Sequence, residues 1–134
     1  MNIANPKVVI TEDDPDLLEA LVREFRDSQF DVFTARNGVE GVSRVLQVRP
    51  QLIMLDLLMP EMNGHEMMQE LISHHAWVKE IPILVTTNYS VSDGNAQDWM
   101  KQVRMAYVLK SDMGLAAIVE QAKKLLQPVS EEVY

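Results

Sequence analysis

The sequence contains no cysteine, few aromatic residues and few basic ones. Without cysteine, disulfide bonds and thiolate chemistry are excluded, and a cytoplasmic location is the natural expectation. Lysine and arginine number 12 against 20 aspartates and glutamates, and the formal net charge is -8. This balance argues against direct binding to nucleic acids, because proteins that bind them neutralise phosphates with a basic surface.

Long apolar runs are also missing. No run approaches the ~20 residues that a membrane-spanning helix needs, and residues 1–7 are too short and polar for a signal peptide, so we expect no association with membranes. What the chain does have is 47% hydrophobic and 24% charged residues over 134 positions. That composition suits one compact domain with a sizeable core. We place this domain at residues 1–128, followed by an acidic tail at residues 129–134.

Short β-forming segments alternate along the chain with segments of helical periodicity. Strands are expected at residues 7–10, 30–34, 52–55, 81–87 and 106–109. Helices are expected near residues 15–27, 39–49, 67–72, 96–103 and 115–126. The alternation predicts an α/β fold with a doubly wound, five-stranded parallel sheet. Its expected form is the flavodoxin-like three-layer sandwich with strand order 2-1-3-4-5.

Acidic residues follow two strands at the edge where such folds bind ligands. Glu12 and Asp13 come after the first strand and Asp56 after the third. The expected order makes these strands neighbours, so the three carboxylates should converge. Carboxylates this close do not all stay ionised unaided, so either some are protonated or a cation joins them. Oxygen ligands without His or Cys favour Mg²⁺ over zinc.

Two later strands bring further groups to the same edge. Lys110 follows the fifth strand with a positive charge, and Thr86 and Thr87 end the fourth with hydroxyls that can donate to a phosphoryl oxygen. Asp56 is then a carboxylate nucleophile with a cation, a lysine and a hydroxyl around it. These are the groups that phosphorylation of an aspartate requires.

Several short motifs in order resemble those of the response regulator receiver domain of two-component signalling, in particular its chemotaxis regulators. The resemblance spans nearly the whole chain. The motifs are Glu12-Asp13-Asp14-Pro15, Asp56-Leu57-Leu58-Met59-Pro60 with Gly64, Thr87 five residues after Pro82, and Tyr107-Val108-Leu109-Lys110.

The resemblance implies a role for each site residue. Asp56 would be the phosphoacceptor, phosphorylated by a sensor histidine kinase or a histidine phosphotransfer protein. Lys110 would contact the phosphoryl group, Thr87 would be the switch hydroxyl, and Tyr107 would be the aromatic that changes rotamer with it. Mg²⁺ would be held by Asp13, Asp56 and the Leu58 backbone carbonyl, with Glu12 acting through a metal-bound water.

The resemblance also implies a signalling module rather than an enzyme. Phosphorylation would alter the face made by the fourth helix, fifth strand and fifth helix, where Trp99, Met100 and Met105 are expected to contact a downstream protein partner. The sequence does not name that partner. A homodimer linked to phosphorylation is a further expectation.

Three places depart from the family pattern. Val103-Arg104-Met105 replaces the Gly-Ala turn expected before the fifth strand. Ser111 stands where the family usually has proline after the lysine. If that peptide is cis in the family, a residue other than proline would cost about 2.5 to 4 kcal/mol, so the loop is either strained or rebuilt. Asn88 stands where a small residue usually follows the threonine.

Each of these residues also has a purely structural interpretation. Asp56 could be a solvated loop carboxylate, and Glu12 could belong to a cap and helix-dipole cluster with its neighbours. Lys110 could be a surface ion-pair partner, and Tyr107 an ordinary strand aromatic. Thr86 is the alternative candidate for the switch hydroxyl.

The histidines point to no metal site. His74 and His75 are adjacent on a helix and do not share a face, so a solvated helix end is favoured. His65 has no evident partner in the sequence.

Three other functions compete with phosphorylation-dependent signalling. A dehalogenase-like, Mg²⁺-dependent phosphatase would carry a second aspartate two residues after the nucleophile, where this chain has Leu58. A flavodoxin-like electron carrier would need a phosphate-binding loop after the first strand, where the acidic run would repel it. A degenerate receiver that binds partners without phosphorylation stays open because of Ser111.

Overall fold

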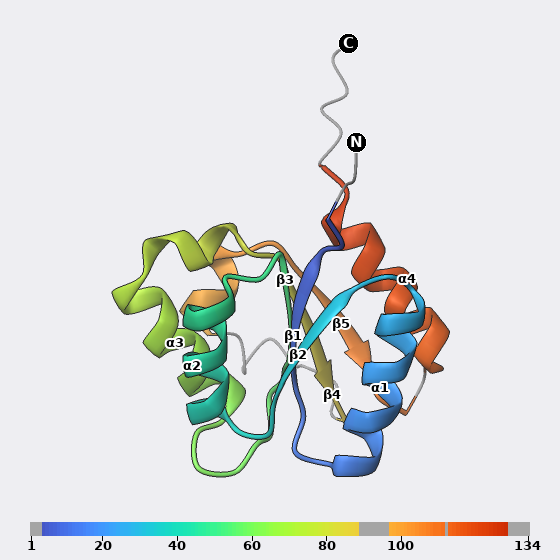
Figure 1. Ribbon diagram of the computed structural model, residues 1–134. Helices are drawn as coiled ribbons and strands as arrows, with labels where there is room; N and C mark the ends of the chain where they lie inside the picture. The colour runs from blue at the N-terminus through green and yellow to red at the C-terminus, as the bar shows by residue number, and fades with distance from the viewer. Residues whose placement is uncertain (1–3, 89–96, 112, 129–134) are drawn as a thin grey trace.

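Five parallel strands in the order β2-β1-β3-β4-β5 form a single sheet, as the sequence predicts (Figure 1). The computed structural model describes residues 4–88, 97–111 and 113–128. The strands are β1 (Lys7–Thr11), β2 (Asp31–Ala35), β3 (Leu52–Asp56), β4 (Ile83–Thr87) and β5 (Met105–Leu109). The helices are α1 (Pro15–Asp27), α2 (Gly38–Val48), α3 (Gly64–His74) and α4 (Leu115–Leu126), with short 3-10 helices η1 (Ala76–Glu80) and η3 (Asp98–Gln102).

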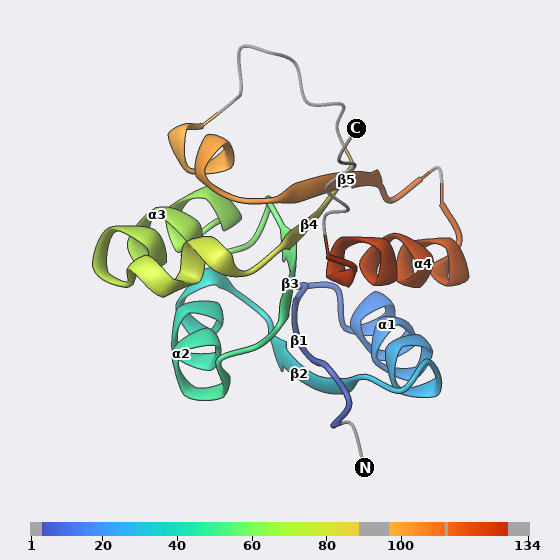
Figure 2. The same cartoon turned by 90° about the horizontal axis from the view of Figure 1, so that it is seen from above.

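Helices cover both faces of the sheet and make three layers. Figure 2 shows α2 and α3 on one side and α1 and α4 on the other. All five residues of β3 are buried, as expected of a central strand with helices on both faces. The core is therefore split in two, with Leu55, Met67 and Trp99 on the α2 and α3 side. Met54 and Phe25 lie on the α1 and α4 side.

Local sequence signals begin α1 at the predicted residue, whereas α3 begins at Gly64, before the predicted start near residue 67. Asp14 caps α1, its side chain accepting from the backbone N–H groups of Asp16 and Leu17, and proline follows at the first helical position. Asn63 and Glu66 form a reciprocal capping box at the start of α3. These caps set where each helix leaves the carboxyl edge of the sheet.

The helix expected over residues 96–103 is not confirmed. Residue 96 lies outside the described residues, and residues 98–102 form only η3. The apolar spacing does mark a buried face, because Trp99 and Met100 are 2% and 9% exposed. Little more than one turn of 3-10 helix is enough to bury both side chains, so their spacing does not require a full α-helix.

Strand boundaries differ slightly from expectation. β1 runs on to Thr11, β4 begins at Ile83, and β5 begins at Met105. Within the described part of the chain, no helix is long and apolar enough to cross a bilayer.

Candidate functional site

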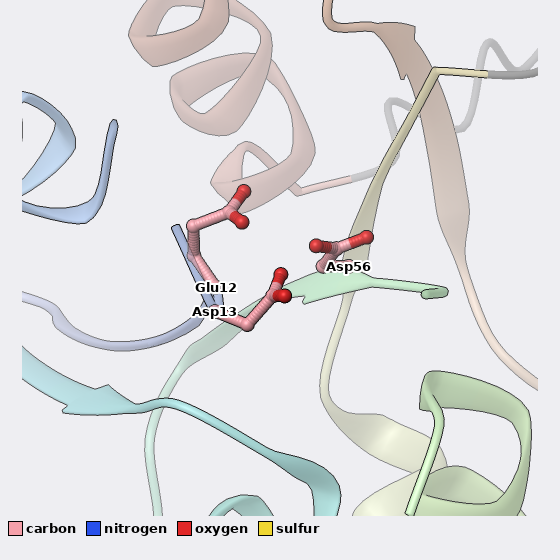
Figure 3. Close-up of side chains that lie close together, drawn as sticks. All are labelled: Glu12, Asp13 and Asp56. Carbon is pink, nitrogen blue, oxygen red and sulfur yellow. The ribbon is translucent and has the colours of Figure 1, made fainter. Parts of the chain in front are cut away.

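Three carboxylates from two neighbouring strands meet at the carboxyl edge of the sheet. Glu12 and Asp13 directly follow β1, and Asp56 is the last residue of β3. Figure 3 shows the three side chains pointing toward one another, and one carboxylate oxygen from each lies within 4.8 Å of the others. Glu12 and Asp56 are 1% and 3% exposed, whereas Asp13 is exposed. The predicted convergence is thus present.

Lys110 reaches the buried pair from the end of β5. Its Nζ atom donates to Oε1 of Glu12 at 2.5 Å and to Oδ2 of Asp56 at 3.0 Å. The lysine side chain is only 14% exposed, so this is not a solvated surface ion pair. The other oxygen of Asp56, Oδ1, accepts from the backbone N–H of Leu58 at 3.0 Å.

The electrostatics of the cluster make Asp56 harder to ionise in the metal-free protein than an ordinary aspartate. Burial, reinforced by the charge of Glu12, raises the pKa of Asp56 to about 7, although Lys110 and the Leu58 N–H oppose the shift. Burial by itself lowers the pKa of Lys110, but its hydrogen bonds to Glu12 and Asp56 outweigh burial and leave that pKa raised. Lys110 can therefore neutralise only one of the two buried acids, Glu12 and Asp56.

An open cavity of about 430 Å³ leads to this cluster. The cavity gives a small solute access to the Asp56 carboxylate. It is lined by Glu12, Asp13, Asp14, Leu17, Asp56, Leu58, Asn88, Lys110 and Ser111.

The donor set fits a hard divalent cation. Carboxylate oxygens from Glu12, Asp13 and Asp56 cluster closely enough to share one ion. Leu58 lines the same cavity. All of these donors are oxygens, as Mg²⁺ prefers. A cation would also offset the burial and the repulsion from Glu12 that together raise the pKa of Asp56.

The two threonines at the end of β4 lie on opposite faces of the sheet. Thr86 pairs with Asp56 in the sheet register, and its hydroxyl donates to the Leu55 carbonyl at 3.4 Å. Thr87 is 4% exposed, and its carbonyl accepts from the Lys110 N–H at 2.9 Å. Because Val85 pairs with Tyr107, Thr87 shares the face of Tyr107.

Tyr107 lies away from the carboxylates, partway along β5. The residue is 39% exposed, and its hydroxyl donates to the Met100 sulfur at 3.3 Å. The expectation that Trp99 and Met100 present a contact surface is wrong for this conformation, because both are buried in the core. Met105 is only partly buried.

The Lys110–Ser111 peptide is trans, since no described peptide bond is cis. The strained cis bond considered for Ser111 is therefore not present in this structure.

Two contacts near the site were missed by the sequence analysis. Thr11 places its hydroxyl between β1 and β3, bonded to both Met54 and Asp56. His65, for which no partner was found, accepts a hydrogen bond at Nδ1 from the Trp99 indole N–H at 3.1 Å. Neither pair has a sequence signal, because the partners are 34 to 45 positions apart. His74 is exposed, as expected of a solvated helix end.

Comparison with known proteins places the chain in a family. Residues 8–123 match the family described as "Response regulator receiver domain". The transcriptional regulatory protein PrrA of Mycobacterium leprae is 30% identical over 125 residues, which are 93% of this chain and 52% of that protein. The hybrid signal transduction histidine kinase D of Dictyostelium discoideum is 38% identical over 87 residues, 64% of this chain and 6% of the kinase. The chain thus spans about half the length of PrrA and a small part of the kinase.

Solved structures agree with the fold. The chemotaxis protein CheY4 of Vibrio cholerae is 21% identical with a TM-score of 0.79, covering 91% of this chain and 99% of that one. Response regulator TrrA of Thermotoga maritima, solved in complex with Mg²⁺-BeF, is 26% identical with a TM-score of 0.74, covering 90% and 98%. With the family match over residues 8–123, these likenesses lead to one conclusion: the chain belongs to the response regulator receiver domain family and is a module of two-component signalling.

Proposed function

We propose that Asp56 is the phosphoacceptor of this receiver domain. The observation that carries the proposal is the buried Asp56 carboxylate with Lys110 at 3.0 Å and two further carboxylates within reach, at the foot of an open cavity. A buried nucleophile, a cation beside it and solvent access are what phosphoryl transfer to a carboxylate needs.

The transfer itself is a displacement at phosphorus. A carboxylate oxygen of Asp56 forms a new O–P bond while the P–N bond of a phosphohistidine breaks. The imidazole leaves with the electron pair of that bond and takes up a proton. Lys110 then faces the dianionic phosphoryl group and supplies a charge-assisted hydrogen bond.

The acidic residues around Asp56 would hold Mg²⁺. Asp13 and Asp56 would be direct ligands with the Leu58 backbone carbonyl, and Glu12 would act through a bound water. The bound ion would supply positive charge to the phosphoryl oxygens and favour the ionised, nucleophilic form of Asp56.

The signal would leave through Thr87 and Tyr107, which share one face of the sheet. The added phosphoryl charge draws the Thr87 hydroxyl toward the site. Tyr107 moves in response, and its hydrogen bond to Met100 is lost. Because Met100 and Trp99 are buried, the face made by η3, β5 and α4 can present them to a partner only after such a rearrangement.

Partners and setting follow from the family. The phosphodonor would be a sensor histidine kinase or a histidine phosphotransfer protein, and the readout a downstream protein rather than nucleic acid. A phosphorylation-linked homodimer and a cytoplasmic location belong to the same proposal. The receiver would occupy residues 1–128, and the family match over 8–123 with α4 ending at Leu126 supports this boundary.

Incubation with acetyl phosphate and Mg²⁺, followed by intact mass spectrometry, tests the proposal. The wild-type protein should gain one phosphoryl group, and Asp56→Asn should gain none. Asp13→Asn should lose Mg²⁺ affinity, whereas Asp14→Asn, which keeps a good helix cap, should not. No gain of mass on the wild type, or an undiminished gain on Asp56→Asn, would contradict the proposal.

A further inference from the structure

The hydroxyl of Thr11 joins the two strands that carry the site. It donates to the Met54 carbonyl at 3.1 Å and accepts from the Asp56 N–H at 3.1 Å. Thr11 is 1% exposed, so water does not compete for either bond. One side-chain group thus satisfies two buried backbone groups of β3.

This bridge stands where the backbone pairing between β1 and β3 ends. The register of these strands runs from Val8 with Leu52 to Ile10 with Met54. Beyond that point the backbone of β1 still pairs with β2, through Thr11 with Ala35. In a parallel ladder, a residue donates its backbone N–H to one carbonyl of the neighbouring strand. Its own backbone carbonyl accepts from the N–H two residues further along that strand. The Thr11 hydroxyl performs both of these roles for β3.

The bridge is also the last described cross-link before the carboxylates. Glu12 and Asp13 are the next residues after Thr11, and Asp56 carries the bonded N–H. The spacing between the ligands of one strand and the nucleophile of the other therefore depends on this hydroxyl as well as on Lys110, which bonds to Glu12 and Asp56. A metal site that needs oxygens at fixed distances is sensitive to that spacing.

We infer that Thr11 is a positioning residue for the phosphorylation site, acting through the Asp56 backbone. The inference rests on the proposed function, since it concerns the geometry of the same carboxylates. Thr11 touches neither the phosphoryl group nor the metal. Its contribution is to hold the end of β3 against the end of β1, so that Asp13 and Asp56 can share one ion.

The test compares Thr11→Val with Thr11→Ser. Valine keeps the shape but removes the hydroxyl, and leaves the Met54 carbonyl and the Asp56 N–H without their partner. Serine keeps the hydroxyl and removes only the methyl group, which lies near Gly41. We expect Thr11→Val to bind Mg²⁺ about tenfold more weakly and to take up the phosphoryl group more slowly than the wild type. Thr11→Ser should keep the wild-type Mg²⁺ affinity and the wild-type rate of phosphorylation.

A stability-matched variant separates positioning from general loss of structure. Val119→Ala removes a buried core side chain on α4, a helix that carries none of the site residues. It should lower the urea midpoint by a similar amount while keeping wild-type Mg²⁺ affinity. Hydrogen exchange of the Asp56 amide should speed up in Thr11→Val and stay slow in Thr11→Ser and Val119→Ala.

Three results would overturn the inference. These are wild-type Mg²⁺ affinity in Thr11→Val, an equal loss in Thr11→Ser, or an equal loss in Val119→Ala. Failure of the proposed function is seen separately, as a wild-type protein that gains no phosphoryl group. The Mg²⁺ affinity and amide exchange of the variants decide the role of Thr11 in either case.

Discussion

Lys110 lies closer to Glu12 than to Asp56, with its Nζ atom 2.5 Å from the first carboxylate and 3.0 Å from the second. The lysine is therefore shared between two buried acids that arrive from different strands. Glu12 is 98 residues away in sequence, and it holds the lysine in the cavity while Asp56 keeps one oxygen bonded to the backbone. This arrangement leads to the first two predictions.

Replacing Lys110 by Met should destabilise the metal-free protein, because it leaves two buried carboxylates without their cation. We expect a loss of about 2 to 3 kcal/mol in the free energy of unfolding at pH 8. Urea unfolding in EDTA measures it. Lys101→Met, which changes an exposed lysine on η3, is the control and should be near neutral. Equal losses in the two variants would show that the buried contacts do not matter.

The contribution of Asp56 to the stability of the metal-free protein should fall as the pH rises from about 4 to about 7. The pKa of Asp56 is raised from 3.8 to about 7 in the folded state, so in this window the folded state binds more protons than the unfolded one. Asp56→Asn should be more stable than the wild type above pH 7, and the difference should vanish near pH 4. Urea unfolding in EDTA across this range measures the difference, and a constant difference would contradict the prediction.

His65 should contribute a pH dependence of the opposite sign. Its Nδ1 accepts from Trp99, which only the neutral ring with its proton on Nε2 can do, and burial lowers its pKa in the folded state. The unfolded state therefore binds more protons below about pH 6.5, and stability falls as the pH decreases. His65→Gln should flatten this part of the profile between pH 5 and 7. An unchanged slope in urea unfolding would show that His65 does not titrate in this way.

Gly64→Ala should be costly although Gly64 has an ordinary backbone conformation. A Cβ atom there would lie 2.5 Å from the Asp56 carbonyl oxygen and 2.9 Å from the Leu57 Cα, and neither backbone atom can move cheaply. We expect a loss of about 1 to 3 kcal/mol in thermal or urea unfolding. Gly114→Ala meets nothing within 4 Å and should be close to neutral. Similar effects at both glycines would rule out the steric explanation.

Much of the fold could be predicted because the local sequence signals and the packing of the core favour the same helices and strands. The apolar run before Asp56 is a central strand, and Asp14 with Pro15 begins α1 as expected. Where the two disagree, tertiary packing prevails. Trp99 and Met100 have helical spacing, yet they are buried by a 3-10 helix, because burial requires only that both side chains reach the core.

The sequence by itself determined the alternation of strands and helices and, through its motifs, the family with its strand order. Given that order, the carboxylate cluster follows, because strand ends in a parallel sheet converge at one edge. Only the tertiary structure decided how the cluster is held. Lys110 is shared with Glu12, the Thr11 hydroxyl links β1 to β3, and Trp99 donates to His65. Each of these contacts joins residues that are distant in the sequence. Periodicity and spacing place a residue on a strand or face, whereas such contacts depend on the rotamers and packing that the whole fold imposes.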